Sequence, residues 1–184
     1  MDASVHAAMR VYAEAQTPEN FHRLRYAVAA TSDYQPYSTS PSQALAGKDH
    51  TDFAEATKTL LPLIGNWFLN PGIHQLLSFF HHKMGNAKSA ELEFALSTYF
   101  INGILSTGDG SEERPYHVLH TADEYDILEH LGKKSSSQSL ILKPPTTALD
   151  RQACEDGSVL WFDVSIPYGR LVTSRDHSHQ PDSD

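Results

Sequence analysis

Apolar residues recur at three- and four-residue spacing at the start of the chain, which is the pattern of amphipathic helices. The first such segment spans residues 3–15 and contains no glycine or proline. Thr17-Pro18 then combines an N-cap residue with a first-turn proline, so a second helix should run to about Ala30. The positions that form the two apolar faces are Val5, Ala8, Met9 and Tyr12 in the first helix and Phe21, Leu24 and Val28 in the second.

Residues 32–49 have no regular period, because prolines, a glycine and several serines interrupt the segment. We expect a long loop there. Tyr34 and Tyr37 flank a proline in its first part and should hold the loop to the body of the protein, although tyrosine with proline can also build a recognition surface.

The helical period returns at Thr51, and Pro62 should bend or shorten the helix that starts there. Asn70-Pro71 then opens a helix with a cap and a first-turn proline, and Gly85-Asn86 ends it. A further helix is expected over residues 87–105. The short connection predicts that these last two helices are antiparallel neighbours.

This helix pair has the residue spacing of a tetratricopeptide unit, in which large, small and aromatic residues let two helices nest closely. Leu77, Gly85, Ala90 and Phe94 occupy the corresponding positions. An ordinary helical hairpin would explain the same residues, and both interpretations stay open.

A Gly-Asp-Gly junction follows the long helix. Gly108 suits the left-handed position after a helix, and Asp109-Gly110 suits the turn beyond it. Residues 115–119 could form a strand. Thr121 with Glu124 three residues later has the pattern of a capping box for another helix.

The C-terminal third favours strands over helices. Residues 133–138 are serine-rich and predict a loop, and residues 139–142 predict a strand. A short helical turn is expected over residues 147–154, and residues 159–164 have the clearest strand pattern. From residue 173 the chain contains too little apolar surface to fold and should be disordered.

These elements predict an α+β fold that is mostly α. Tetratricopeptide-like antiparallel helical hairpins should precede a small antiparallel sheet with one capped helix. We expect a helical block over residues 1–105, a small α+β part over 106–172 packed on it within one cooperative domain, and a disordered tail over 173–184.

Composition excludes several classes of protein. The apolar runs are far shorter than the ~20 residues of a membrane span, so no membrane association is expected. The formal net charge of −9 and the lack of basic runs argue against nucleic acid as a partner. An acidic protein instead suits a basic protein partner, because complementary charge speeds association.

Cys154 is the single cysteine, which excludes an intrachain disulfide and a thiolate-rich zinc site. The segment 74–85 contains several histidines but no carboxylate, so no metal is expected there. We expect no cofactor. The N-terminus lacks the pattern of a secretory signal, which favours the cytoplasm.

Six segments between about residues 20 and 165 together resemble a bacterial family of domains of unknown function, DUF4919, which is associated with tetratricopeptide-like helices. The resemblance implies a fold and a set of positions rather than a reaction. The segments are Phe21–Tyr26, Asp33–Tyr37, Leu105–Gly110, Pro115–Val118, Glu124–Leu128 and Trp161–Val164.

Five residues within these segments form a candidate ligand-binding site where the early loop would meet the Gly-Asp-Gly junction. Arg25 could pair there with Asp109 or with a ligand carboxylate, since guanidinium suits bidentate pairing. A structural ion pair between loop and turn is the alternative. The five residues are Arg25, Tyr34, Tyr37, Asp109 and Tyr116.

The leading functional hypothesis is a non-enzymatic module that binds a protein or peptide partner on helical hairpins. An immunity or antitoxin-type protein that neutralises a cognate toxin is one alternative. A hydrolase-like enzyme that uses His117 or His120 with Asp109 is another, but we identify no catalytic residues, and the oligomeric state stays open.

Overall fold

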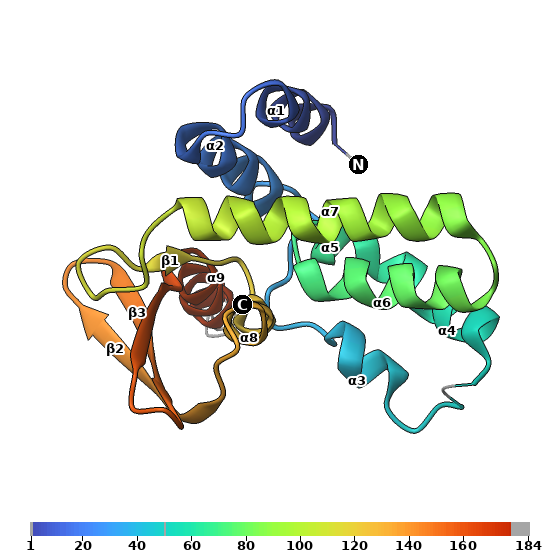
Figure 1. Ribbon diagram of the computed structural model, residues 1–184. Coiled ribbons are helices and arrows are strands. Elements are labelled where there is room, and N and C mark those ends of the chain that lie inside the picture. Colours follow the sequence, from blue (N-terminus) through green and yellow to red (C-terminus); the bar gives the residue numbers. More distant parts are fainter. Residues whose placement is uncertain (1, 50, 178–184) are drawn as a thin grey trace, which may run out of the picture.

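The computed structural model describes residues 2–49 and 51–177, with residues 173–177 described by their backbone alone. Figure 1 shows the arrangement of the elements in space. The helices are α1 (Ala3–Glu14), α2 (Pro18–Ala29), α3 (Pro41–Leu45), α4 (Phe53–Leu60), η1 (Leu61–Leu63, a 3-10 turn), α5 (Ile64–Trp67), α6 (Pro71–Lys83), α7 (Ala87–Ser106), α8 (Thr121–His130) and α9 (Ser165–His177). The strands are β1 (Tyr116–His117), β2 (Ser135–Lys143), β3 (Thr147–Cys154) and β4 (Val159–Asp163).

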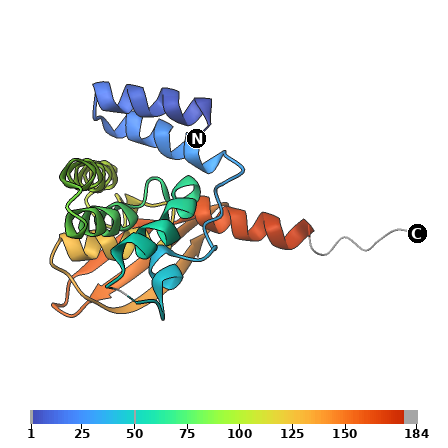
Figure 2. The ribbon, with the colours of Figure 1, turned by 90° about the vertical axis from the view of Figure 1, so that its right-hand side faces the viewer.

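Helices α1 and α2 form a pair that covers one side of the molecule (Figure 2). The predicted cap is confirmed, since the Thr17 hydroxyl accepts the Asn20 N–H and Pro18 occupies the first turn. Phe21 packs directly against Gly103 of α7, where a Cβ atom would lie 2.4 Å from the phenyl ring. A glycine is therefore needed at 103 for α2 to approach α7 this closely.

The segment expected to be a long loop contains one short helix. The helix α3 begins after Ser40, whose side chain accepts from Gln43 N while the Gln43 side chain accepts from Ser40 N. This capping box was not recognised in the sequence. Pro62 lies in η1, so the predicted interruption of the helix after Leu60 is confirmed.

Helices α6 and α7 lie side by side in both ribbon views (Figures 1 and 2). The Asn70 side chain accepts from Ile73 N and caps α6, and Gly85 ends it with a φ of 75°. Phe94 is 64% exposed, so it contributes little to packing within the hairpin. Tetratricopeptide-like character stays a prediction.

The Gly-Asp-Gly junction differs from its predicted geometry. Gly110, not Gly108, has the left-handed conformation, with a φ of 77°. Gly108 is required for a close approach instead, because a Cβ atom there would lie 2.3 Å from the carbonyl oxygen of Arg114. The expected strand over residues 115–119 is reduced to Tyr116 and His117.

The start of α8 also differs from the prediction by one residue. The N-cap is His120, so Thr121 is the first helical residue and Asp123 takes the third position. Asp123, rather than Glu124, accepts the N–H of the N-cap residue. Glu124 points elsewhere and is fully buried.

The sheet has the order β1-β4-β3-β2 and is mixed. A small antiparallel sheet was predicted; β2 with β3 and β3 with β4 are antiparallel, but β1 pairs with β4 in parallel. The helical turn predicted over residues 147–154 is wrong, since this segment is β3, one of the two inner strands. The loop predicted over 133–138 is also partly wrong, because β2 begins at Ser135.

The α+β fold that is mostly α is therefore confirmed. The main hydrophobic core joins both predicted parts of the chain, with Phe21 and Ile104 from the helical block and Ile127 and Phe162 from the part that follows. The helix α9 continues into the predicted disordered tail as far as His177, and residues 178–184 lie outside the described part of the chain. Within the residues that the structure describes, no helix is both long and apolar enough to cross a bilayer.

Candidate functional site

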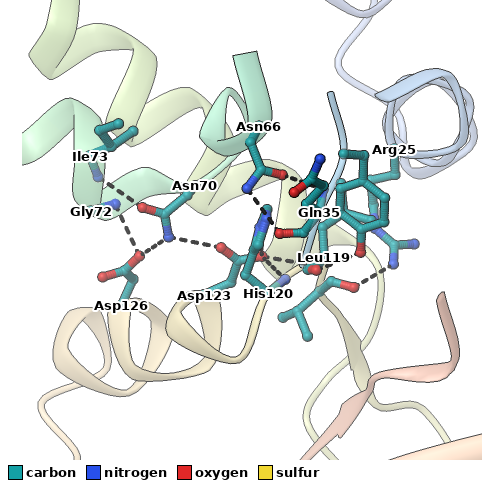
Figure 3. A network of polar contacts seen from close by, with 12 residues as sticks. Arg25, Gln35, Asn66, Asn70, Gly72, Ile73, Leu119, His120, Asp123 and Asp126 are labelled. Carbon is teal, nitrogen blue, oxygen red and sulfur yellow. Dashed lines mark hydrogen bonds and ion pairs between the residues drawn. The ribbon is translucent and has the colours of Figure 1, made fainter. Parts of the chain in front are cut away.

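Two of the predicted site residues contact the segment before α8, and Figure 3 shows Arg25 there beside Leu119. Arg25 is 2% exposed, and its Nη2 donates to the carbonyl oxygen of Val118 at 3.0 Å. The Tyr34 hydroxyl donates to the carbonyl oxygen of Leu119 at 2.6 Å. Both side chains thus hold the backbone of residues 118–119 from the α2 side.

Asp123 holds the same segment from the other side. Its Oδ2 accepts the N–H groups of Leu119 and His120, each at 2.9 Å. Its Oδ1 accepts from Asn70 Nδ2 at 2.8 Å. Three donors therefore satisfy this buried carboxylate, which is the arrangement that makes a buried charge tolerable.

Asn70 extends the network to a second carboxylate. Its Nδ2 also donates to Asp126 Oδ2 at 2.7 Å, and the Gly72 N–H donates to the same oxygen at 3.0 Å. Burial and the nearby charge of Asp123 raise the pKa of Asp126 to about 7. These contacts tie the N-terminus of α6 to α8 (Figure 3).

His120 lies inside this network without using its ring nitrogens. The ring stacks on Trp67 with 3.9 Å between centroids, and neither nitrogen has a hydrogen-bond partner. Burial lowers the pKa of His120, so the ring is neutral at neutral pH. A fully buried, stacked imidazole cannot reach a substrate.

The residues of the hydrolase hypothesis, His117 or His120 with Asp109, do not lie together. His117 has Asp163 as its nearest carboxylate, at 3.9 Å from Nδ1, and burial lowers the pKa of His117 to about 4. Asp109 instead contacts Arg114 at 3.2 Å and accepts the Ser111 N–H. The hydrolase hypothesis stays a prediction without geometric support.

The predicted pairing of Arg25 with Asp109 is wrong. The Arg25 guanidinium is buried against Val118 and His22, whereas the Asp109 side chain is 51% exposed and paired with Arg114. Asp109 lies in an exposed turn between α7 and β1, which is why it does not reach α2. Tyr116 packs nearby against Gly110 and Phe162.

Tyr37 lies at a different place from the other four predicted residues. It is 56% exposed and lines a hollow of 360 Å³ that also involves the sheet and α9. The five predicted residues therefore do not converge on one site. Arg25 and Tyr34 share the buried network, Asp109 and Tyr116 share the junction, and Tyr37 borders the hollow.

The hollow contains polar residues that the sequence did not reveal. Asp150 of β3 lines it and is 7% exposed, and Gln138 of β2 donates to Asp150 Oδ2 at 2.7 Å. Glu124 lies behind, with Oε2 accepting from Gln152 at 2.7 Å and Oε1 without a hydrogen-bond partner. Burial, and next the charge of Asp150, raise the pKa of Glu124 to about 9.

One signal in the sequence could have indicated this cluster. In β3 every second residue from Ala148 is buried, namely Ala148, Asp150, Gln152 and Cys154. Alternation with period two indicates a strand. The signal was missed because Asp150 and Gln152 are polar, and a search for apolar periodicity passes over them.

The strand β2 borders the hollow and forms one edge of the sheet (Figure 1). Seven of its nine residues are exposed, and no charged residue or proline occurs between Ser135 and Leu142. In an antiparallel pair, alternate residues direct their backbone groups away from the neighbouring strand. Within the described part of the chain, no further backbone segment pairs with these outward-facing groups.

Another apolar surface lies on the helical hairpin. Phe79 of α6 and Phe94 of α7 border a shallow hollow of 490 Å³ and are 49% and 64% exposed. This is the face on which the hairpin hypothesis would place a partner. The described lining of this hollow contains no buried charged side chain, and its residues belong to helices whose backbone groups are hydrogen-bonded within the helix.

Metal binding finds no support in the geometry of residues 2–49 and 51–177, where no three His, Cys, Asp or Glu side chains are grouped to hold an ion.

Comparison with known protein families gives a match over most of the chain. The profile of a family described as "Domain of unknown function (DUF4919)" matches residues 12–170. Neither the curated proteins nor the solved structures include a significant match to the chain.

Proposed function

We propose that this chain, which belongs to the DUF4919 family, is a non-enzymatic module that binds an extended segment of a partner protein along the edge of β2. The observation that carries the proposal is the long, exposed and uncharged edge between Ser135 and Leu142. Natural sheets protect such edges with charges, prolines or a covering element, and an edge left open is a template for another strand.

The apolar residues of β2 support the same proposal. Leu140 and Leu142 are 49% and 53% exposed and, being two residues apart, lie on one face of the strand. This face turns toward Tyr168 of α9, which borders the hollows beside both leucines. A segment paired with β2 would cover both leucines and bury their side chains.

The net charge of −9 disfavours pairing of two copies through this edge and suits a basic partner.

A cytoplasmic location is part of the proposal.

A peptide display experiment tests the strand-addition mode. A library of random nonapeptides is selected on the purified chain, and the strongest peptide is labelled and measured by fluorescence polarisation. Each backbone nitrogen of the peptide is then methylated in turn. We expect the affinity to fall by about tenfold or more at every second position, because only alternate N–H groups face β2.

A peptide that tolerates methylation at all positions, or that loses affinity with a helical three- or four-residue period, would contradict the proposal. Selection of no peptide would contradict it as well.

A further inference from the structure

Two hollows lie side by side along the face of β2 that carries Leu140 and Leu142. The first has a volume of 360 Å³ and contains Leu140, Asp150 and Tyr37 in its lining. The second has a volume of 460 Å³ and is lined by Leu142, with prolines and α9 residues around it. Tyr168 borders both, so they form one groove between β2 and α9.

The first hollow contains a carboxylate without a counter-ion. Asp150 is 7% exposed, and its neighbours are the neutral amide of Gln138, which donates to it, and the buried carboxyl group of Glu124, which shares a side-chain hydrogen bond with it. No Lys or Arg of the described residues forms an ion pair with it. Hydrogen bonds satisfy the carboxylate only in part because neither neighbour is a cation, so a cation supplied from outside would bind here favourably.

A second carboxyl group, that of Glu124, lies behind Asp150. Glu124 behind Asp150 is fully buried, and its Oε1 lacks a hydrogen-bond partner. Because burial raises the pKa of Glu124 to about 9, this carboxyl keeps its proton at neutral pH. Asp150 is therefore the group at the wall of the hollow that a single basic side chain can reach, and Glu124 lies behind it.

The walls of the hollow suit a long side chain with a charged end. Leu140 offers an apolar surface for methylene groups, and Tyr37 and Tyr168 contribute aromatic side chains to the lining. Lysine and arginine have this combination of apolar stem and charged end.

The second hollow indicates which side chain the bound segment carries two residues away from the basic one. Leu142, Pro144 and Val172 make its lining mostly apolar. Side chains two residues apart in a strand point to the same face and lie roughly 6.7 Å apart. A segment that pairs with β2 thus places one side chain opposite Leu140 and another opposite Leu142.

We infer that the partner segment carries a lysine or arginine whose charged end enters the hollow beside Asp150 and, two residues away, an apolar side chain that covers Leu142. This inference rests on the proposed strand addition and names the side chains that it recognises.

The nonapeptide selected on the full chain tests the inference. We expect a Lys or Arg and an apolar residue at a fixed spacing of two. Replacing that lysine by norleucine, or an arginine by citrulline, removes the charge but keeps the carbon stem. The Kd should rise about tenfold or more, since a buried charged hydrogen bond is lost.

Asp150→Asn should weaken the original peptide by a similar factor and should leave the affinity for the uncharged peptide nearly unchanged, because the two changes remove the same contact. Glu155→Gln is the matched control. It removes one negative charge on an exposed residue outside the groove and should change the Kd by less than about twofold. Thermal melting checks that both variants fold.

Peptides without a basic residue, or an unchanged Kd after the norleucine substitution, would overturn the inference. The alternate methylation pattern would persist in that case, so strand addition would stand. Loss of that pattern would instead overturn the proposed function.

Discussion

Asp123 and Glu124 are neighbours on α8 and are both fully buried, yet they lie in opposite surroundings. Asp123 faces α6 and the segment before α8, where it accepts three hydrogen bonds from Asn70, Leu119 and His120. Glu124 faces the sheet, where it accepts one hydrogen bond from Gln152 and lies beside the carboxylate of Asp150.

The difference separates a structural network from a binding surface. Around Asp123 the donors come from within the chain and the charge is satisfied. Around Glu124 and Asp150 the chain supplies two acids but no cation among the described residues, and the hollow beside them opens on the edge of β2. We therefore expect substitutions at Asp123 to affect stability and substitutions along β2 to affect binding.

The largest effect is expected for Asp123→Ala. The change leaves the N–H groups of Leu119 and His120 buried without an acceptor and removes the link to Asn70. The free energy of unfolding should fall by about 3 kcal/mol or more, measured by urea denaturation at neutral pH.

Asp109→Ala is the matched control, because its ion pair with Arg114 is exposed. We expect it to leave the free energy of unfolding nearly unchanged, because exposed ion pairs contribute little to stability. Equal losses from the two variants would contradict the central role of Asp123.

Glu124→Gln should produce a pH-dependent stabilisation. The folded protein keeps the Glu124 proton up to a pKa of about 9, whereas the unfolded chain releases it near the ordinary value of 4.5. Between these two pH values the unfolded state binds fewer protons, so wild-type stability falls as pH rises. Glutamine has no proton to release and can still accept from Gln152.

The stability advantage of Glu124→Gln over wild type should therefore grow from about pH 4.5 to about pH 9, where it reaches on the order of a few kcal/mol. Urea denaturation at pH 5, 7 and 9 measures it. Groups common to both proteins cancel in the difference. An advantage that stays constant with pH would show that Glu124 is ionised in the folded protein.

A smaller effect is expected for Leu140→Ala on the affinity for the selected peptide. Loss of the apolar surface that the peptide covers should raise the Kd by about three- to tenfold. Stability should change by less than about 0.5 kcal/mol, because Leu140 is half exposed in the free protein.

Phe94→Ala provides the comparison on the helical hairpin, since Phe94 is also an exposed apolar residue. It should leave the Kd unchanged. If Phe94→Ala weakened binding and Leu140→Ala did not, the partner would lie on the hairpin rather than on β2.

Sequence predicts the helical part well, because its signals are local. The cap at Thr17, the first-turn proline Pro71 and the interruption at Pro62 each depend on a few neighbouring residues, and all three are confirmed. The predicted capping box of α8 was wrong by one residue. Asp123 and Glu124 are both acidic, and the local spacing favoured Glu124 over Asp123.

Sequence predicts the sheet less well, because its determinants are distant. Residues 147–154 contain alanine, leucine, glutamine and arginine, which favour a helix. They form an inner strand because β2 and β4 supply hydrogen bonds on both sides. The proximity of Asp150 to Glu124 depends on the same distant contacts, so the hollow could not be predicted.

The separation of Arg25 from Asp109 has a similar cause. Both occur in segments that resemble the family, but Arg25 projects into the network beneath residues 118–119 and Asp109 into an exposed turn. The binding-module and immunity hypotheses both require a partner protein, and the immunity form stays a prediction.

Amide hydrogen exchange of β2 tests strand addition most directly. NMR exchange rates are measured for Ser135 to Lys143 with and without saturating selected peptide. We predict that alternate amides in this strand slow by about tenfold or more on binding, because each gains a backbone acceptor from the added segment. Unchanged exchange along β2 when the peptide is bound would contradict strand addition.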